Sequence, residues 1–285
     1  MIISHSSCII RDKVNPMSER IPPTRFEQNK KVNVFVEAVA RWHRKADVQG
    51  VENILKIKEL LDEGFPVATF SNHLGHLDGP MIPTEFKNIS PELRAAYAPV
   101  VGEVIWRNRL TRICMYAYSG SLMPSKRLKP KSDDAHGWEL RERRKEAAHK
   151  AAAEDLANRK LLGLFPEASR SRHKGLTKVS PNISKYLYLV PNTYVVPVGF
   201  WGTEKVLPPD TKFIIPRFWN KPHMKVGSPI SVPELEVRVG LSESKEENDQ
   251  KLADELMYEV AQLLPEEYRG YYAQRSESRD HFPRQ

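Results

Sequence analysis

Short apolar runs recur along this chain with long charged segments between them, and this alternation constrains the fold more than any other feature. Each run has the length of a strand, contains β-branched or aromatic residues, and is bounded by glycine, proline or polar residues. The clearest run is Phe65–Phe70, and further runs lie at 116–123, 160–165, 193–200, 211–216 and 224–230. Strands that alternate with helices predict an α/β fold in which a central, mostly parallel or mixed sheet is flanked by helices.

The segments between these runs have helical patterns. At 31–44, apolar residues recur with a helical period and basic residues flank them, which is typical of an amphipathic helix that packs on a core or lies on a membrane surface. Further helices are expected at 50–62, 92–115, 137–158 and 243–264. The dense charges of 137–158 indicate a solvated face with ion pairs four residues apart, in preference to a surface that binds nucleic acid.

The length of 285 residues and a hydrophobic content of 40% predict a single domain. We expect it to span 31–273, between a flexible N-terminal arm at 1–30 and a flexible tail at 274–285, with Met17 as a second candidate start. The longest run without charge, 186–203, contains Pro191 and Pro197, so it is strand and turn rather than a membrane span. If the protein acts on lipid, it must lie on the membrane surface.

The net charge of +8 favours acidic partners, which include nucleic acid, anionic lipid headgroups, phosphorylated metabolites and an acidic carrier protein. The two cysteines, Cys8 and Cys114, suggest neither a disulfide framework nor a metal site. They therefore predict a reducing compartment, the cytoplasm.

The first candidate site follows the run Phe65–Phe70, where Asn72 and His73 are followed by Asp78. Five positions on a regular helix turn roughly 140°, so His73 and Asp78 would not share a helix face. They can meet if the chain turns between them, and Gly75 is a residue able to turn. The end of a strand before a helix is where α/β proteins bind ligands, and there a histidine held by a carboxylate can act as a general base.

His76 is a second candidate base, although we expect it to pack or hydrogen bond beside the site. An alternative is a metal-dependent hydrolase that uses His73, His76 and Asp78 as zinc ligands. No other cluster of ligand residues completes such a site in the sequence, so we expect no metal.

Two further loops follow probable strands. One contains the basic pair Lys126 and Arg127, a weak signal alone. In the other, after Phe165 and Pro166, the small residues at 168–169 allow a tight turn that would direct Glu167 and Arg170 beyond the end of the strand. A guanidinium group matches phosphate geometry with two parallel donors, although a surface ion pair is the alternative.

In order, these motifs resemble the four sequence blocks of the glycerolipid acyltransferases, which include 1-acylglycerol-3-phosphate and glycerol-3-phosphate acyltransferases. The blocks are Asn72-His73-x4-Asp78, Gly120 to Lys126 and Arg127, Phe165–Ser171 and Val195–Gly199. The similarity covers about 65–204, and Leu264–Gly270 is similar to the C-terminal segment of some bacterial members. The chain departs from the family's usual residues in having Gly75 for serine, Ala168-Ser169 for Gly-Thr and Lys126 for arginine.

The resemblance implies a glycerolipid-acyltransferase-like α/β fold and an enzyme of phospholipid biosynthesis. A fatty acyl group would pass from a thioester of coenzyme A or acyl carrier protein to a hydroxyl of a glycerol-phosphate or lysophospholipid acceptor. His73 would be the general base, oriented by Asp78 and kept neutral by a helix that begins near Gly75.

The resemblance also implies the remaining site residues and partners. The polar head of the acceptor would be bound by Lys126, Arg127, Glu167, Ser169 and Arg170, and the site would be shaped by Asn72, Gly75 and Pro197. No cofactor is expected besides the thioester co-substrate. The enzyme would be peripheral to the inner face of an anionic membrane and would not bind nucleic acid. A basic membrane-surface protein without catalytic activity is the remaining alternative.

Overall fold

The computed structural model describes residues 23–29, 46–103, 112, 118–124, 129–171, 173–206, 217 and 219–274. Several predictions therefore concern residues outside the described part. They are the amphipathic helix at 31–44, the strand at 211–216, both cysteines, the basic pair Lys126 and Arg127, and the tail beyond 274.

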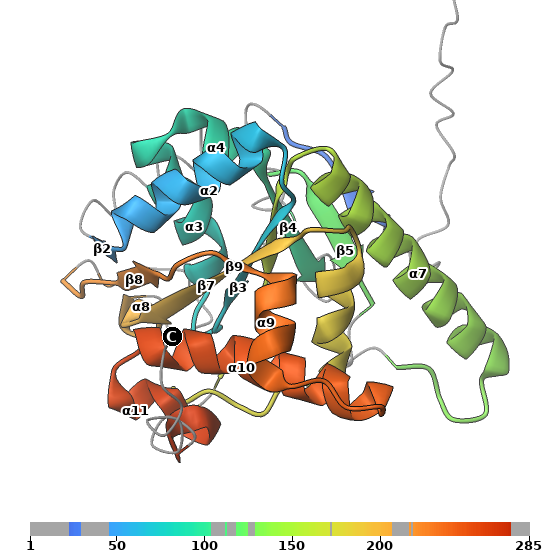
Figure 1. Ribbon diagram of the computed structural model, residues 1–285. Helices are drawn as coiled ribbons and strands as arrows, with labels where there is room; N and C mark the ends of the chain where they lie inside the picture. The colour runs from blue at the N-terminus through green and yellow to red at the C-terminus, as the bar shows by residue number, and fades with distance from the viewer. Residues whose placement is uncertain are drawn as a thin grey trace, which may run out of the picture.

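The described residues form a nine-stranded sheet with the strand order β1-β5-β4-β6-β3-β7-β8-β2, and β9 pairs with β7 (Figure 1). Five strand pairs are parallel, and β1–β5, β7–β8 and β7–β9 are antiparallel. The predicted α/β fold with a mostly parallel or mixed sheet is confirmed. The strands are β1 Arg25–Phe26, β2 Asp47–Gln49, β3 Val67–Ser71, β4 Tyr97–Gly102, β5 Gly120–Met123, β6 Leu161–Leu164, β7 Tyr194–Trp201, β8 His223–Val226 and β9 Ile230–Ser231.

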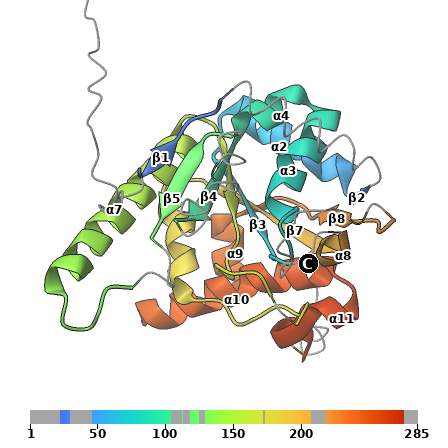
Figure 2. The same ribbon diagram turned by 180° about the vertical axis from the view of Figure 1, so that it is seen from behind.

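Helices cover both faces of the sheet (Figures 1 and 2). On one face lie α2 Val51–Glu63, α3 Asp78–Ile89 and α4 Pro91–Ala96. On the other lie α7 Ala135–Ala157, the 3-10 helix η2 Pro181–Tyr188, α9 Val232–Val239 and α10 Lys245–Leu263. Short elements complete the described helices: α8 Thr203–Val206, α11 Glu266–Arg269 and the 3-10 helix η3 Gly270–Tyr272.

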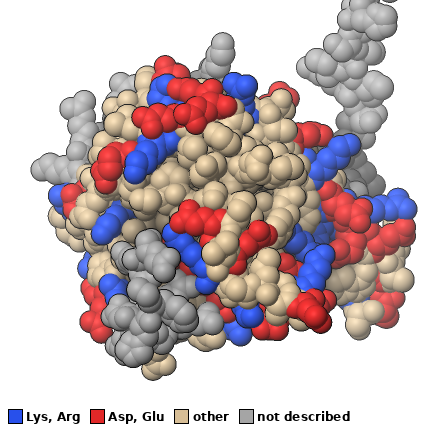
Figure 3. Space-filling model, in the orientation of Figure 1, with Lys and Arg blue, Asp and Glu red and all other residues tan. Residues whose placement is uncertain are grey.

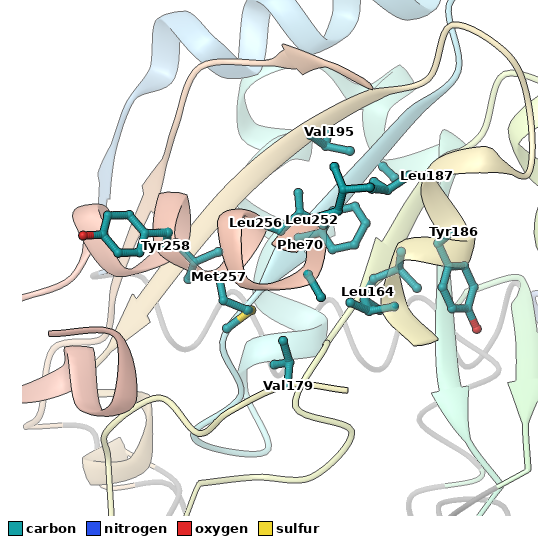
Figure 4. Packing of buried hydrophobic residues seen from close by; sticks show 14 of the residues in the cluster. Phe70, Leu164, Val179, Tyr186, Leu187, Val195, Leu252, Leu256, Met257 and Tyr258 are labelled. Carbon is teal, nitrogen blue, oxygen red and sulfur yellow. The ribbon is translucent and has the colours of Figure 1, made fainter. Parts of the chain in front are cut away.

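Two hydrophobic cores follow from the alternation of side chains along the central strands. On β7, Val195 belongs to the core under α10, whereas Val196 belongs to the core under α2 and α3. On the α10 side, Phe70 of β3 packs with Leu252 and Leu256 of α10 (Figure 4). Because both faces are buried, the central strands read as continuous apolar runs in the sequence.

The helix predicted at 92–115 is confirmed at 92–96 and is wrong at 97–102. The helix α4 ends at Ala96, and β4 follows at once and pairs with β5 and β6. The physical reason is Pro99, which cannot donate a hydrogen bond within a helix and disfavours the helical conformation of the residue before it.

Two short strands went unrecognised in the sequence. Within the arm expected at 1–30, Arg25 and Phe26 form β1, and the Phe26 side chain is buried against the sheet. Asp47–Gln49 forms β2 at the opposite edge. Among the residues that the structure describes, no helix combines the length and the apolar composition needed to span a membrane.

The parallel pairing places three loops at the carboxyl ends of the central strands. The strand β3 pairs with β6 at Phe70 and Leu164 and with β7 at Ser71 and Val198. The chain segments that follow β3, β6 and β7 therefore leave the sheet side by side, which is where open α/β sheets bind ligands.

Candidate active site

His73 and Asp78 are in contact at the carboxyl ends of the central strands. His73 lies in the loop after β3, and its Nδ1 is 2.8 Å from Oδ2 of Asp78, the first residue of α3. The same carboxylate oxygen accepts hydrogen bonds from the backbone N–H groups of Leu74 (2.6 Å) and Gly75 (2.8 Å). These bonds hold the predicted turn. The helix, however, begins at Asp78 rather than near Gly75.

The contact determines where His73 carries its proton. A carboxylate can only accept, so Nδ1 of His73 donates to Asp78, and in the neutral imidazole Nε2 is the nitrogen with the lone pair. The His73 side chain is 21% exposed and that of Asp78 is fully buried. Part of the imidazole is therefore exposed to solvent, whereas the acid that contacts it is buried.

The loop after β6 forms hydrogen bonds with both backbone groups of His73. Oε2 of Glu167 accepts from the His73 N–H at 2.9 Å, and the Ser171 N–H donates to the His73 carbonyl at 2.8 Å. The Phe165 ring lies beside the imidazole with centroids 4.6 Å apart. Three residues of this loop thus position the candidate base.

Glu167 is directed into the protein. Its Oε1 accepts from both the N–H and the hydroxyl of Thr177, at 3.1 Å each. Burial raises the pKa of the Glu167 carboxyl, and the hydrogen bonds from His73 and Thr177 oppose that shift. We expected Glu167 to face the acceptor, but both of its oxygens contact protein donors.

Arg170 is held by His76. Nη1 of Arg170 forms a hydrogen bond with Nε2 of His76, and because a guanidinium can only donate, Nε2 is the acceptor. This bond requires the tautomer of His76 that has its proton on Nδ1. As predicted, His76 forms a hydrogen bond beside the site, and the bond brings Arg170 to the turn that contains His73.

The expected site-shaping residues have structural partners. The Asn72 side chain is fully buried and bonds to both the N–H and the carbonyl of Phe200 in β7. Pro197 lies within β7 opposite Phe70, and its ring packs close to Gly227. Gly75 contributes its N–H to Asp78.

The turn after Glu167 has a left-handed residue. Ala168 has φ +55°, a conformation that favours glycine, while Ser169 is exposed on the loop. Lys126 and Arg127, the other expected acceptor-binding residues, lie outside the described residues.

The alternative of a zinc site formed by His73, His76 and Asp78 has no supporting geometry in the described part of the chain. No group of three His, Cys, Asp or Glu side chains there could hold a metal ion. His76 contacts Arg170, whereas His73 contacts Asp78.

Sequence reasoning missed Thr177 and the ring contact of Phe165 with His73. Phe165 belongs to the sequence block Phe165–Ser171, so the sequence indicated that it lies next to the site. Thr177 had none, because it lies ten residues beyond Glu167 in a stretch without a motif.

The chain is similar to known proteins. The family model named Acyltransferase matches residues 45–201, more than half of the chain. A crystal structure of the 1-acyl-sn-glycerophosphate (LPA) acyltransferase PlsC from Thermotoga maritima is similar, with a TM-score of 0.48 and 18% identity over 82% of this chain and 79% of that chain. A search of curated proteins found no match.

Proposed function

This chain belongs to the acyltransferase family, and from that premise we propose that it transfers a fatty acyl group from an acyl thioester to a hydroxyl of a glycerol-phosphate or lysophospholipid acceptor. The observation that carries the proposal is the contact between His73 Nδ1 and Asp78 Oδ2, which leaves Nε2 of an accessible imidazole free to accept a proton.

The reaction needs a base and no covalent enzyme intermediate. Nε2 of His73 takes the proton of the acceptor hydroxyl as its oxygen attacks the thioester carbonyl. The new C–O bond forms, the C–S bond breaks, and the protonated imidazole returns the proton to the departing thiolate. Asp78 stabilises the imidazolium, and base catalysis of this kind contributes roughly 10²–10⁴-fold in rate.

The acceptor's phosphate would bind next to the base. A guanidinium group has paired donors that match phosphate geometry, and the contact of Arg170 with His76 brings this group to the turn. Lys126, Arg127 and Ser169 complete the proposed acceptor site. The donor is a thioester of coenzyme A or of acyl carrier protein.

We propose that the protein works in the cytoplasm as a peripheral protein on an anionic membrane. The net charge of +8 supports this, but Figure 3 shows Lys and Arg side chains mixed with Asp and Glu on the face it displays. Cosedimentation with vesicles of phosphatidylcholine alone or mixed with phosphatidylglycerol tests the proposal, and equal binding to both would contradict it.

The central test of function is a thiol-release assay with purified protein. Acyl-CoA and acyl carrier protein thioesters are each paired with glycerol-3-phosphate and lysophosphatidate. We expect release that depends on an acceptor and is nearly abolished by His73→Ala. If His73→Ala retains full activity, the proposed base is wrong. Loss of release with a chelator would favour the metal-dependent hydrolase, and no release from any pair would favour a binding protein.

A further inference from the structure

The C-terminal segment, Tyr268–Tyr272, is anchored by two buried tyrosines. The Tyr268 hydroxyl donates to Oε1 of Glu204 in α8 at 2.9 Å, and the Tyr272 hydroxyl donates to Oδ1 of Asp254 in α10 at 2.9 Å. Both tyrosine side chains are buried. The segment is therefore fixed to α8 and α10.

This segment holds the loop Gly175–Val179, which we call the strap. The Leu176 N–H donates to the Tyr268 carbonyl at 3.1 Å, and the Leu176 carbonyl accepts from the Tyr271 N–H at 2.8 Å. The Val179 N–H donates to the Tyr272 hydroxyl at 3.3 Å. Three hydrogen bonds thus join the strap to the C-terminal segment.

Gly270 permits this close contact. Its φ is +50°, and a Cβ atom there would collide with the backbone N and O of Leu176. Gly175 lies opposite, where a Cβ would be 2.8 Å from the Cα of Gly270. Two glycines therefore let the backbones approach.

The strap connects the C-terminal segment to the candidate base. Thr177 in the strap donates twice to Oε1 of Glu167, and Oε2 of the same carboxylate accepts from the His73 N–H. A second route runs through Ser171, whose hydroxyl donates to the Gly175 carbonyl and whose N–H donates to the His73 carbonyl. Both backbone groups of His73 depend on this network.

We propose that Thr177 is a positioning residue for His73, held in place by the C-terminal segment and acting through Glu167. The inference rests on the proposed function, in which His73 is the base. A base must be placed to within a fraction of an ångström of the reacting hydroxyl, so a small displacement of its backbone lowers turnover more than binding.

The first test compares Thr177→Val with Thr177→Ser. Valine has nearly the same shape but lacks the hydroxyl, whereas serine keeps it, and Thr177 is exposed, so neither change disturbs the core. We expect Thr177→Val to lower kcat about tenfold. We expect the KM values of donor and acceptor to change less than about twofold. Thr177→Ser should retain kcat near that of the wild type.

The second test compares Gly270→Ala with Gly240→Ala. Both glycines have positive φ, +50° and +61°, but a Cβ at Gly240 meets nothing within 4 Å. Gly240→Ala controls for replacing a glycine of positive φ, although the ψ values differ (−123° at Gly270 and +94° at Gly240) and the two strains are not equal. Only Gly270→Ala places a Cβ against the strap. We expect Gly270→Ala to lower kcat and to speed hydrogen exchange at the Thr177 amide, and Gly240→Ala to change neither.

An NMR measurement separates this proposal from the proposed function. In ¹H–¹⁵N spectra of ligand-free protein, Thr177→Val should shift the His73 amide resonance while Thr177→Ser leaves it nearly unchanged, whatever the reaction is. If Thr177→Val changes neither that resonance nor kcat, or if Gly240→Ala lowers kcat as much as Gly270→Ala, the positioning role is overturned. If the resonance shifts but the wild type transfers no acyl group, only the proposed function fails.

Discussion

The Asn72 side chain exchanges two hydrogen bonds with the backbone of Phe200. Its Nδ2 donates to the Phe200 carbonyl at 2.9 Å, and its Oδ1 accepts from the Phe200 N–H at 2.7 Å. The side chain thereby extends the pairing of β3 with β7 beyond Ser71. The residue directly before His73 is fixed to the central sheet.

We expect Asn72→Ala to lower the free energy of unfolding by about 2–4 kcal/mol, because it leaves a buried N–H and a buried carbonyl unpaired. Urea denaturation measures the loss. Asn88→Ala is the control, since its side chain is exposed on α3 and bonds to Glu85 there; it should cost less than about 0.5 kcal/mol. Equal losses for the two variants would show that the bonds to Phe200 contribute little.

Replacing Asp78 with asparagine should lower kcat by about 10²–10⁴-fold with little loss of structure. An amide oxygen can still accept from the Leu74 and Gly75 N–H groups, so the turn is retained. The negative charge that stabilises the His73 imidazolium is lost. The measurement is kcat in the thiol-release assay with a circular dichroism spectrum of the same sample. A variant with an unchanged spectrum and wild-type kcat would exclude Asp78 from the mechanism.

The contact between His73 and Asp78 could be predicted from the sequence because it is local. The two residues lie five positions apart after a clear strand, so one turn suffices to join them. The sheet was predictable for a similar reason, since strands buried on both faces appear as apolar runs. A strand such as β2, three residues long, has too few positions for a pattern.

The partners of Glu167 could not be predicted, because they depend on contacts distant in the sequence. The His73 N–H lies 94 positions away from the carboxylate that accepts from it. A sequence shows that a glutamate follows a strand but not whether it turns to solvent or back toward the neighbouring loop. The contact of Thr177 with Glu167 could not be predicted for the same reason, because the sequence does not show which way the Glu167 side chain turns.

Arg170→Ala should chiefly raise the KM of the acceptor and leave kcat within about threefold, because the guanidinium is proposed to bind phosphate equally in the ground and transition states. Arg170→Lys should give an intermediate KM, since lysine supplies a point charge without the paired donors. Steady-state kinetics with varied acceptor measures both. A fall in kcat alone would show that Arg170 acts in the transition state.

Ala168→Gly should stabilise the protein by about 1 kcal/mol, because glycine adopts the left-handed conformation without steric cost. Ala168 has φ +55°. The control is Ala147→Gly within α7, for which the opposite effect is expected: it should destabilise the protein by about 1 kcal/mol. Denaturation midpoints of both variants give the comparison, and destabilisation by Ala168→Gly would show that the alanine methyl contributes packing that outweighs the strain.

Glu167 should make the stability depend on pH. Burial raises the pKa of its carboxyl in the folded state above the ordinary value of 4.5. Between the ordinary and the raised pKa the folded state binds more protons than the unfolded state, so this group's contribution to stability falls as pH rises through that window. Glu167→Gln cannot titrate and should remove this fall, which free energies of unfolding from pH 4 to pH 7 would reveal.

Glu85 is a matched comparison for this prediction, since burial also raises the pKa of its carboxyl. Glu85→Gln should also remove a decrease of stability with rising pH. It should leave kcat unchanged, because Glu85 lies on α3 with Asn88 as its partner. Glu167→Gln should lower kcat as well, since its amide NH₂ cannot accept from the N–H of His73 or of Thr177. If both variants keep full activity, the carboxylate of Glu167 does not position the base.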